Sequence, residues 1–233
     1  MLLTLQQTIR KLKNPKKIIV FQRFFKTGRG EYGFGDVFLG LTVPQSRIIA
    51  LKFKKLSLQD VRRLLHSKYH EERLVALFIL VERFAKADKN VAKTIFDLYL
   101  TNTKFINNWD LIDLSAPKIV GPFLLNRSKA ILYKLAASKS IWERRIAIMG
   151  TFHFIKNKDF TDALKIATIL VNDKHDLIQK AVGWMLREIG NRDQKIEEEF
   201  LKKHYKQMPR TMLRYAIEKF PEKLRLAFLH GRI

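Results

Sequence analysis

The sequence predicts an all-α fold, a HEAT-like helical-repeat solenoid with a concave basic groove, and three observations support this prediction. Apolar residues recur at helical spacing along most of the chain. No segment combines strand-like alternation with a hairpin turn. Five alanines stand in similar amphipathic contexts at intervals of 40, 31, 34 and 35 residues: Ala76, Ala116, Ala147, Ala181 and Ala216. Intervals of this size are typical of stacked helix pairs, in which one helix of each pair lines a concave surface.

The length of 233 residues suits a single helical-repeat domain. We expect residues 1–43 to form N-terminal helices and a glycine-rich loop, and residues 44–233 to form the repeats. The tetratricopeptide signature is absent, so a degenerate HEAT-like array is the better match. The alternative is coincidence, because any helical protein contains some recurring spacings.

Capping residues place several helix starts. Asn14 before Pro15 is typical of an N-cap and a first helical position, and it predicts a helix to about residue 26. Ser57 with Asp60 resembles a capping box. Periodicity predicts the other helices at residues 4–12, 44–53, 71–86, 90–100, 107–125, 128–137, 140–155, 160–171, 176–189, 196–207, 210–220 and 221–229.

A glycine-rich stretch interrupts the helices near the N-terminus. Gly28, Gly30 and Gly33 match the G-x-G-x-x-G dinucleotide-binding pattern by letter. That pattern requires a strand before it and a helix opening within it. Here a charged helix is expected before it, and residues 36–40 make a poor helix start. We therefore interpret the stretch as a flexible basic loop.

Composition limits the possible partners and compartments. Lys and Arg number 45 against 22 Asp and Glu, a net charge of +23, which indicates a polyanionic partner such as nucleic acid. A ribosome-associated or merely adhesive surface is the alternative. The chain has no cysteine, which excludes disulfides and thiolate metal sites. The longest apolar run, residues 74–81, is too short to span a bilayer, and no signal peptide is evident. We expect a soluble, cytoplasmic protein with no membrane association.

Trp109 and Asp113 form the most unusual pair in this basic chain. Their four-residue spacing places them on one face of a helix, one turn apart. An acid in a basic groove repels phosphate, so its presence suggests a task other than affinity. A carboxylate can stabilise the oxocarbenium ion that forms when an N-glycosidic bond breaks. The alternative for Asp113 is a structural ion pair with Arg145 or another cation.

The size of this effect decides which substrate is possible. A carboxylate about 4 Å from the developing cation gains roughly 4 kcal/mol at an effective dielectric near 20. That gain is about a thousandfold in rate. It suffices for a cationic alkylated purine, which is already a good leaving group, and not for a normal base.

The other two tryptophans also lie beside charges. Trp142 has Arg145 three residues on, next to Arg144, and Trp184 shares its face with two cations, Lys180 and Arg187. Such an arrangement predicts an aromatic and basic strip in which cations hold phosphates and rings pack on sugar or base. The alternative is that all three tryptophans are core residues with coincidental charges.

Other chemistries find little support. His66 and His70 are expected on one helix face as a solvated pair, with no third metal ligand nearby. There is no Walker loop, no H-E-x-x-H and no nucleophile elbow. We therefore expect neither a metal nor a cofactor.

Several segments together resemble the AlkD family of DNA alkylation repair glycosylases. They are Phe38-Leu39-Gly40-Leu41, Trp109-Asp110-Leu111-Ile112-Asp113, Trp142-Glu143-Arg144-Arg145 and the run from Ile178 to Glu188. The resemblance covers about residues 21–220. It implies a HEAT-like solenoid that holds duplex DNA and removes positively charged N3- and N7-alkylpurines without a tight base-flipping pocket. The Gly28–Gly35 stretch departs from family members that have a helix there, so the resemblance assigns no role to Tyr32.

By that resemblance, Asp113 is the catalytic carboxylate, Trp109 and Trp184 flank the deoxyribose of the lesion, and Arg145 contacts the DNA backbone. The expected DNA-binding residues are Arg144, Arg145, Lys180, Arg187 and Trp142. The leading hypothesis is a monomeric, monofunctional alkylpurine DNA glycosylase. The alternatives are a non-catalytic helical-repeat protein that binds nucleic acid, and a protein-binding scaffold, which the charge argues against.

Overall fold

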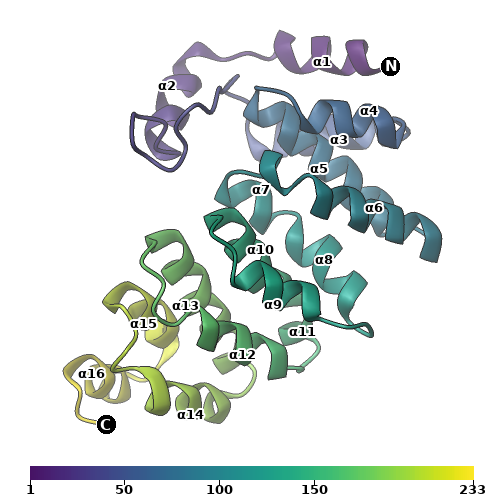
Figure 1. Ribbon diagram of the computed structural model, residues 1–233. Helices are drawn as coiled ribbons and strands as arrows, with labels where there is room; N and C mark the ends of the chain where they lie inside the picture. Colours follow the sequence, from purple (N-terminus) through teal and green to yellow (C-terminus); the bar gives the residue numbers. More distant parts are fainter. The chain divides into compact units, whose positions relative to one another are not determined.

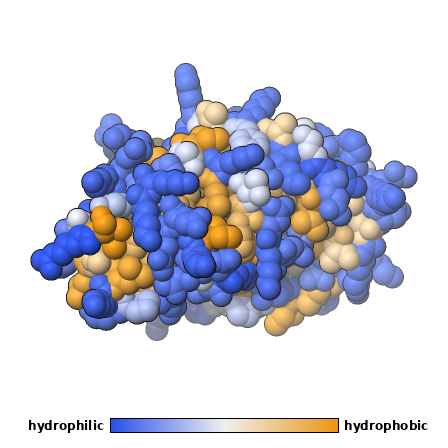
Figure 2. All heavy atoms as spheres, turned by 90° about the horizontal axis from the view of Figure 1, so that it is seen from below, coloured by the Kyte–Doolittle hydropathy of each residue, from blue (hydrophilic) through white to orange (hydrophobic).

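The computed structural model describes residues 1–233, and it is helical without any strand, which confirms the all-α prediction (Figure 1). A single isolated bridge joins Val37 to Tyr69. The chain divides into two compact units, Met1–Ile119 and Val120–Ile233. None of the helices has the length and apolar character needed to cross a membrane. Hydrophilic side chains cover most of the face seen in Figure 2, with smaller hydrophobic areas between them.

The first unit holds the helices up to the start of α8. They are α1 (Leu2–Lys11), α2 (Pro15–Phe24), α3 (Val43–Lys52), α4 (Leu58–Leu65), α5 (His70–Phe84), α6 (Lys89–Thr101), η1 (Thr103–Phe105), α7 (Trp109–Asp113) and α8 (Ala116–Leu124), which crosses the boundary. The second unit holds α9 (Ala130–Ala136), α10 (Ile141–Gly150), α11 (Phe152–Lys156), α12 (Thr161–Ile169), α13 (Asp176–Gly190), α14 (Gln194–His204), α15 (Arg210–Ala216), η2 (Ile217–Lys219) and α16 (Glu222–His230).

The predicted N-caps are confirmed, but only the Ser57 half of the expected capping box forms, because the Asp60 side chain pairs with Arg63. The Asn14 side chain accepts a hydrogen bond from the Lys17 N–H at 3.1 Å, and Pro15 opens α2. The Ser57 hydroxyl accepts from the Asp60 N–H at 3.1 Å at the start of α4. Each cap satisfies a backbone donor that the first turn leaves without a partner, which fixes the helix start in the sequence.

Two long predicted helices are each broken in the structure. The helix expected at 107–125 divides into α7 and α8, and the one expected at 140–155 divides into α10 and α11. At the first break the Ser115 hydroxyl donates to the Leu111 carbonyl at 2.5 Å, and at the second Thr151 donates to the Ile148 carbonyl at 2.6 Å. Hydroxyls that bond to carbonyls of the preceding turn bend or interrupt a helix, while the apolar periodicity continues across the break.

Helix α5 is the centre of the first unit. Every residue from His70 to Leu80 is buried, because α1, α3, α4, α6 and α7 all contact it. Periodicity predicted this helix at residues 71–86, but its burial on all sides comes from tertiary packing. The charged residues of its first turn are buried with the rest, and they need partners inside the protein.

The helical-repeat prediction is confirmed, and the repeated alanines lie in the core. All five are inaccessible to solvent: Ala76, Ala116, Ala147, Ala181 and Ala216. In the second unit α13 packs on α15. A Cβ added to Gly183 of α13 would overlap the Met212 carbonyl of α15. Small residues at these positions let neighbouring helices approach closely.

The second unit also buries an acid without a full set of partners. Glu197 of α14 is 1 % exposed, and its Oε1 atom has no hydrogen-bond partner. Its carboxyl packs against Gly190 at the end of α13. Burial raises the pKa of Glu197 to about 9, against a weaker opposing effect of the Arg187 charge. The side chain is therefore neutral in the folded protein at neutral pH.

We expect Glu197→Gln to stabilise the protein, by about 1–3 kcal/mol at pH 8. Between the ordinary pKa of 4.5 and about 9, folding must protonate Glu197, so its contribution to stability falls as pH rises. Glutamine has no such proton to take up. Urea unfolding at pH 5 and pH 8 measures the difference between the two proteins, which should widen with pH. A difference that is the same at both pH values contradicts the assignment.

Candidate functional site

Helix α7 carries both residues of the predicted catalytic pair. Trp109 opens the helix and Asp113 closes it, and both are partly exposed. The three residues between them, 110–112, are buried. The two side chains therefore share the accessible side of α7, as their spacing predicted.

The start of α7 is tied to the interior by Asn108. This residue is completely buried, and its Oδ1 accepts from the Trp109 N–H at 2.8 Å. Its amide nitrogen donates to Asp36 Oδ2 at 3.0 Å. One side chain thus caps the helix and joins it to a segment more than seventy residues earlier in the chain.

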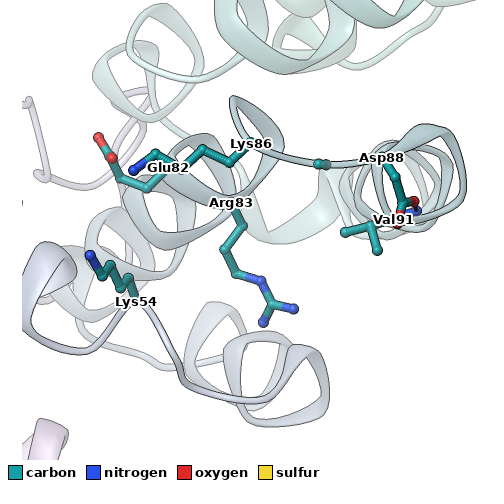
Figure 3. Close-up of a pocket in the computed structure, with 7 residues that line it drawn as sticks. Lys54, Glu82, Arg83, Lys86, Asp88 and Val91 are labelled. Carbon is teal, nitrogen blue, oxygen red and sulfur yellow. Dashed lines mark hydrogen bonds between the residues drawn. The ribbon is translucent and has the colours of Figure 1, made fainter.

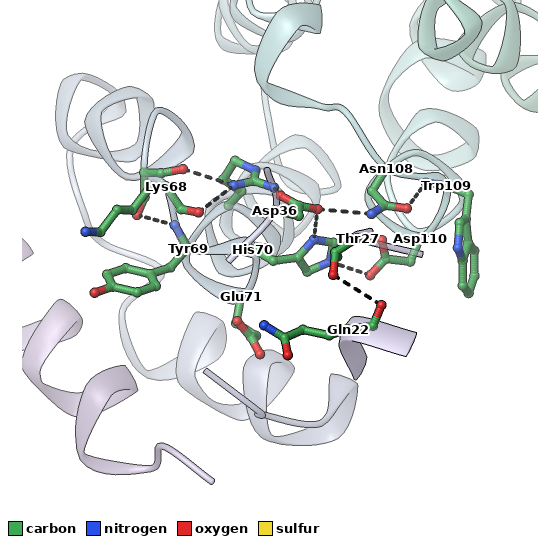
Figure 4. A network of polar contacts seen from close by, with 12 residues as sticks. Gln22, Thr27, Asp36, Lys68, Tyr69, His70, Glu71, Asn108, Trp109 and Asp110 are labelled. Carbon is green, nitrogen blue, oxygen red and sulfur yellow. Dashed lines mark hydrogen bonds and ion pairs between the residues drawn. The ribbon is translucent and has the colours of Figure 1, made fainter. Parts of the chain in front are cut away.

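Beneath α7 lies a buried polar network that we call the His70 cluster (Figure 4). Its members are Asp36, His70, Arg73, Asn108 and Asp110. His70 Nδ1 lies 3.0 Å from Asp36 Oδ2, and His70 Nε2 lies 2.8 Å from Asp110 Oδ2. Arg73 pairs with the other oxygen of Asp36. The imidazole therefore bridges two carboxylates from different parts of the first unit.

Charges in the cluster balance. Burial opposes ionisation of Asp36, but hydrogen bonding to His70 and the Arg73 charge outweigh it and lower its pKa to about 2. Burial also opposes protonation of His70, but the charge and hydrogen bond of Asp110, together with Asp36, raise its pKa to about 9. At neutral pH an imidazolium therefore lies between two carboxylates, and Arg73 supplies the second positive charge.

The expectation that His66 and His70 form a solvated pair on one helix face was wrong. Helix α4 ends at Leu65 and α5 begins at His70, so the two histidines lie on different elements. His66 stacks on Phe105 at 3.8 Å between ring centroids, and His70 is 2 % exposed. No group of three or more potential ligand side chains is arranged to hold a metal ion.

Two aromatic rings at the end of α2, Phe24 and its C-cap Phe25, hold the Trp109 side chain. The indole stacks on Phe25 at 5.3 Å and meets Phe24 edge-on at 5.7 Å. Phe25 in turn stacks on Phe38 at 4.9 Å, and Phe38 stacks on His70 at 4.5 Å. A continuous set of rings thus runs from the His70 cluster to Trp109. Phe24 is 61 % exposed, so the set ends at the surface.

The glycine-rich loop follows helix α2 and consists of turns, which confirms that it is not a dinucleotide-binding loop. Beyond it, the buried Glu71 carboxylate accepts three backbone N–H groups, those of residues 39, 40 and 41, at 2.7–3.2 Å. Gly40 has a φ of +86°, and a Cβ there would overlap the Asn14 carbonyl. Only glycine fits this turn, which places the segment beside the first turn of α5.

In the second unit, Trp184 lies on a partly exposed face of α13 together with Lys180 and Arg187. Its indole N–H donates to Glu188 Oε1 at 3.2 Å. The Phe152 ring lies 6.0 Å away, centroid to centroid. Trp142 is half-buried on α10. The tryptophans are therefore neither fully buried nor fully exposed.

The predicted DNA-binding cations have partners within the protein. Lys180 lies 3.0 Å from Asp176, and Arg187 pairs with Glu218. Arg144 pairs with Asp173 at 2.7 Å and also donates to two backbone carbonyls at 3.0 Å. Arg145 is 5 % exposed and donates to the Leu177 carbonyl. The i,i+4 pair of Asp176 and Lys180 was visible in the sequence. The partners of Arg144, Arg145 and Arg187 come from distant segments, so sequence spacing did not show them.

A cavity of about 300 Å³ lies in the first unit beside the end of α5 (Figure 3). Its lining mixes both signs of charge: Lys54, Glu82, Arg83, Lys86, Ala87, Asp88 and Val91. Arg83 donates to the Leu56 carbonyl at 2.7 Å, and Asp88 caps α6. No aromatic side chain is present to stack on a base, so this cavity is not a nucleobase pocket.

Comparison with known proteins agrees with this fold. A family model described as DNA alkylation repair enzyme matches residues 5–220. A solved structure described as a predicted DNA alkylation repair enzyme from Enterococcus faecalis is similar, with a TM-score of 0.69 and 16 % identity, over 90 % of this chain and 97 % of that chain. At that identity the likeness shows the fold alone. No curated protein sequence matches. Because the family model covers nearly the whole chain, the protein belongs to the DNA alkylation repair enzyme family.

Proposed function

We propose that the protein is a monofunctional DNA glycosylase that excises positively charged N3- and N7-alkylpurines from duplex DNA. The observation that carries the proposal is α7, which holds a partly exposed carboxylate, Asp113, one turn from the Trp109 indole in a chain of net charge +23. Membership of an alkylation repair family supports a reaction on damaged DNA.

In the proposed reaction, the bond between C1′ of the deoxyribose and the purine nitrogen breaks, and its electrons neutralise the cationic base. Asp113 stabilises the positive charge that remains on the sugar. Water then adds at C1′ and loses a proton, which leaves an abasic site and a neutral alkylpurine. Trp109, one turn from Asp113, packs on the deoxyribose.

Product analysis tests this function directly. Wild-type protein incubated with duplex DNA containing 7-methylguanine is expected to release free 7-methylguanine and to leave abasic sites. Recovery of unmodified guanine in the strand would indicate removal of the alkyl group instead. Binding without release of any base would support the non-catalytic alternative, a helical-repeat protein that recognises nucleic acid.

We also propose that phosphates are bound by cations of α10 and α13, namely Arg144, Arg145, Lys180 and Arg187, with Trp142 packed beside them. Duplex affinity should then fall steeply with salt, because each phosphate contact contributes about −0.9 to the slope of log affinity against log salt concentration.

Arg145→Ala is expected to make this slope shallower by about one phosphate contact. Fluorescence anisotropy between about 50 and 200 mM salt measures it. Thermal unfolding of both proteins is the control, since Arg145 also bonds to the Leu177 carbonyl. An unchanged slope removes Arg145 from the phosphate contacts.

A further inference from the structure

We propose that His70 is a positioning residue for the excision step: its bridge between Asp36 and Asp110 fixes α7 and thereby the Asp113 carboxylate. This inference rests on the proposed glycosylase function. His70 touches neither DNA nor the reacting atoms in this scheme, because it lies buried beneath α7.

Helix α7 needs external support. It has five residues, little more than one turn, and a helix of that length is not stable by itself. Its first two anchors converge on the same place: Asn108 donates to Asp36, and Asp110 contacts His70. His70 also contacts Asp36, which Arg73 holds as well, so one imidazole contacts the partner of the first anchor and is itself the partner of the second.

The Asp110 anchor has no substitute. Asp110 Oδ1 is buried without a hydrogen-bond partner, so the contact of Oδ2 with His70 is what holds this side chain. Without the imidazolium, two carboxylates would be buried near each other with Arg73 as the nearest counter-charge. An outward shift of α7 relieves that arrangement, and Asp113 moves with it. A displacement of about 1 Å at a catalytic group costs up to about a hundredfold in rate.

The test compares His70→Gln with a matched control on the same turn, Glu72→Gln. Glu72 is also fully buried, but it bonds to Arg10 and Gln6 of α1 and not to α7. Both variants remove one buried charge from the start of α5. We expect His70→Gln to lower the single-turnover rate constant for release of 7-methylguanine at least about tenfold, with duplex Kd changed less than about threefold. Glu72→Gln should keep the wild-type rate constant at temperatures where it is folded.

The pH dependence of the single-turnover rate constant is a second test, because loss of stability alone does not produce the expected shift. In wild-type protein the rate constant should fall above about pH 9, where His70 loses its proton and keeps only one donor for two carboxylates. Asp110→Asn removes the negative charge that most favours the protonated imidazole, so the fall should begin at lower pH. Asparagine has nearly the same shape, so this variant carries the test if His70→Gln does not fold.

The outcomes separate the two proposals. If wild-type protein releases no alkylpurine, the glycosylase function itself fails. If wild-type protein is active and His70→Gln and Glu72→Gln lose the same fraction of activity, His70 is a structural residue only and the inference fails. An unshifted pH profile in Asp110→Asn overturns it as well.

Discussion

Asp113→Asn is expected to abolish release of 7-methylguanine from methylated duplex DNA while duplex binding stays intact or becomes stronger. The carboxylate contributes roughly 4 kcal/mol when it lies about 4 Å from the sugar cation. Its loss therefore lowers the rate about a thousandfold. Asparagine has the same shape and no charge, and removal of a negative charge from a DNA-binding surface favours phosphate binding.

Asp97→Asn is the matched control for this experiment. Asp97 is an exposed aspartate of α6 in the same unit, where it pairs with Lys93 on the surface. The substitution changes the net charge by the same amount, so any general effect of charge on binding should appear in both variants. Base release by Asp97→Asn should match that of wild-type protein. If Asp113→Asn retains more than about a tenth of wild-type activity, the charge-stabilisation role is wrong.

The helices could be predicted because their signals are local. Asn14 and Ser57 fixed helix starts through bonds that span three residues. The breaks at Ser115 and Thr151 were missed because the apolar period runs through them. A serine or threonine hydroxyl interrupts a helix only when its surroundings favour the competing bond. The Ser115 hydroxyl also forms a hydrogen bond of 2.9 Å with the buried Tyr99 hydroxyl. The two residues are too far apart in the sequence for local patterns to reveal this contact.

Only the local part of the candidate site could be predicted from the sequence. The spacing of Trp109 and Asp113 is local, and the structure places both on the accessible side of one helix. The His70 cluster joins residues that are 34 and 40 positions apart. The one sign of this cluster in the sequence was a run of charged residues at the start of a very apolar helix. Charges buried at such a position require partners inside the protein. Which partners they would be depended on the tertiary fold.

We expect Asp36→Asn to be the most destabilising single substitution in the His70 cluster, by about 3–5 kcal/mol at neutral pH. Asp36 accepts from Arg73, His70 and Asn108, and it is 8 % exposed. Its removal leaves two buried cations with only Asp110 to balance them. Asparagine also turns an N–H group toward donors that already face the site. Urea unfolding at pH 7 measures the loss.

The pH dependence distinguishes this cause from simple loss of packing. The lowered pKa of Asp36 means that its stabilising contribution is present above 3.8 and is lost as pH falls toward about 2. The raised pKa of His70 means that its contribution is present below 6.5 and is lost as pH rises through about 9. Wild-type stability from the pair should therefore be greatest between about pH 4 and pH 6.5. In Asp36→Asn the loss of stability at acid pH should disappear. The loss of stability at alkaline pH should begin at lower pH, because one of the two carboxylates that favour the imidazolium is gone.

The matched control is Asp60→Asn, which removes an aspartate that pairs with an exposed arginine and should cost at most about 1 kcal/mol of stability. Equal losses in the two variants contradict the balance of charge in the cluster.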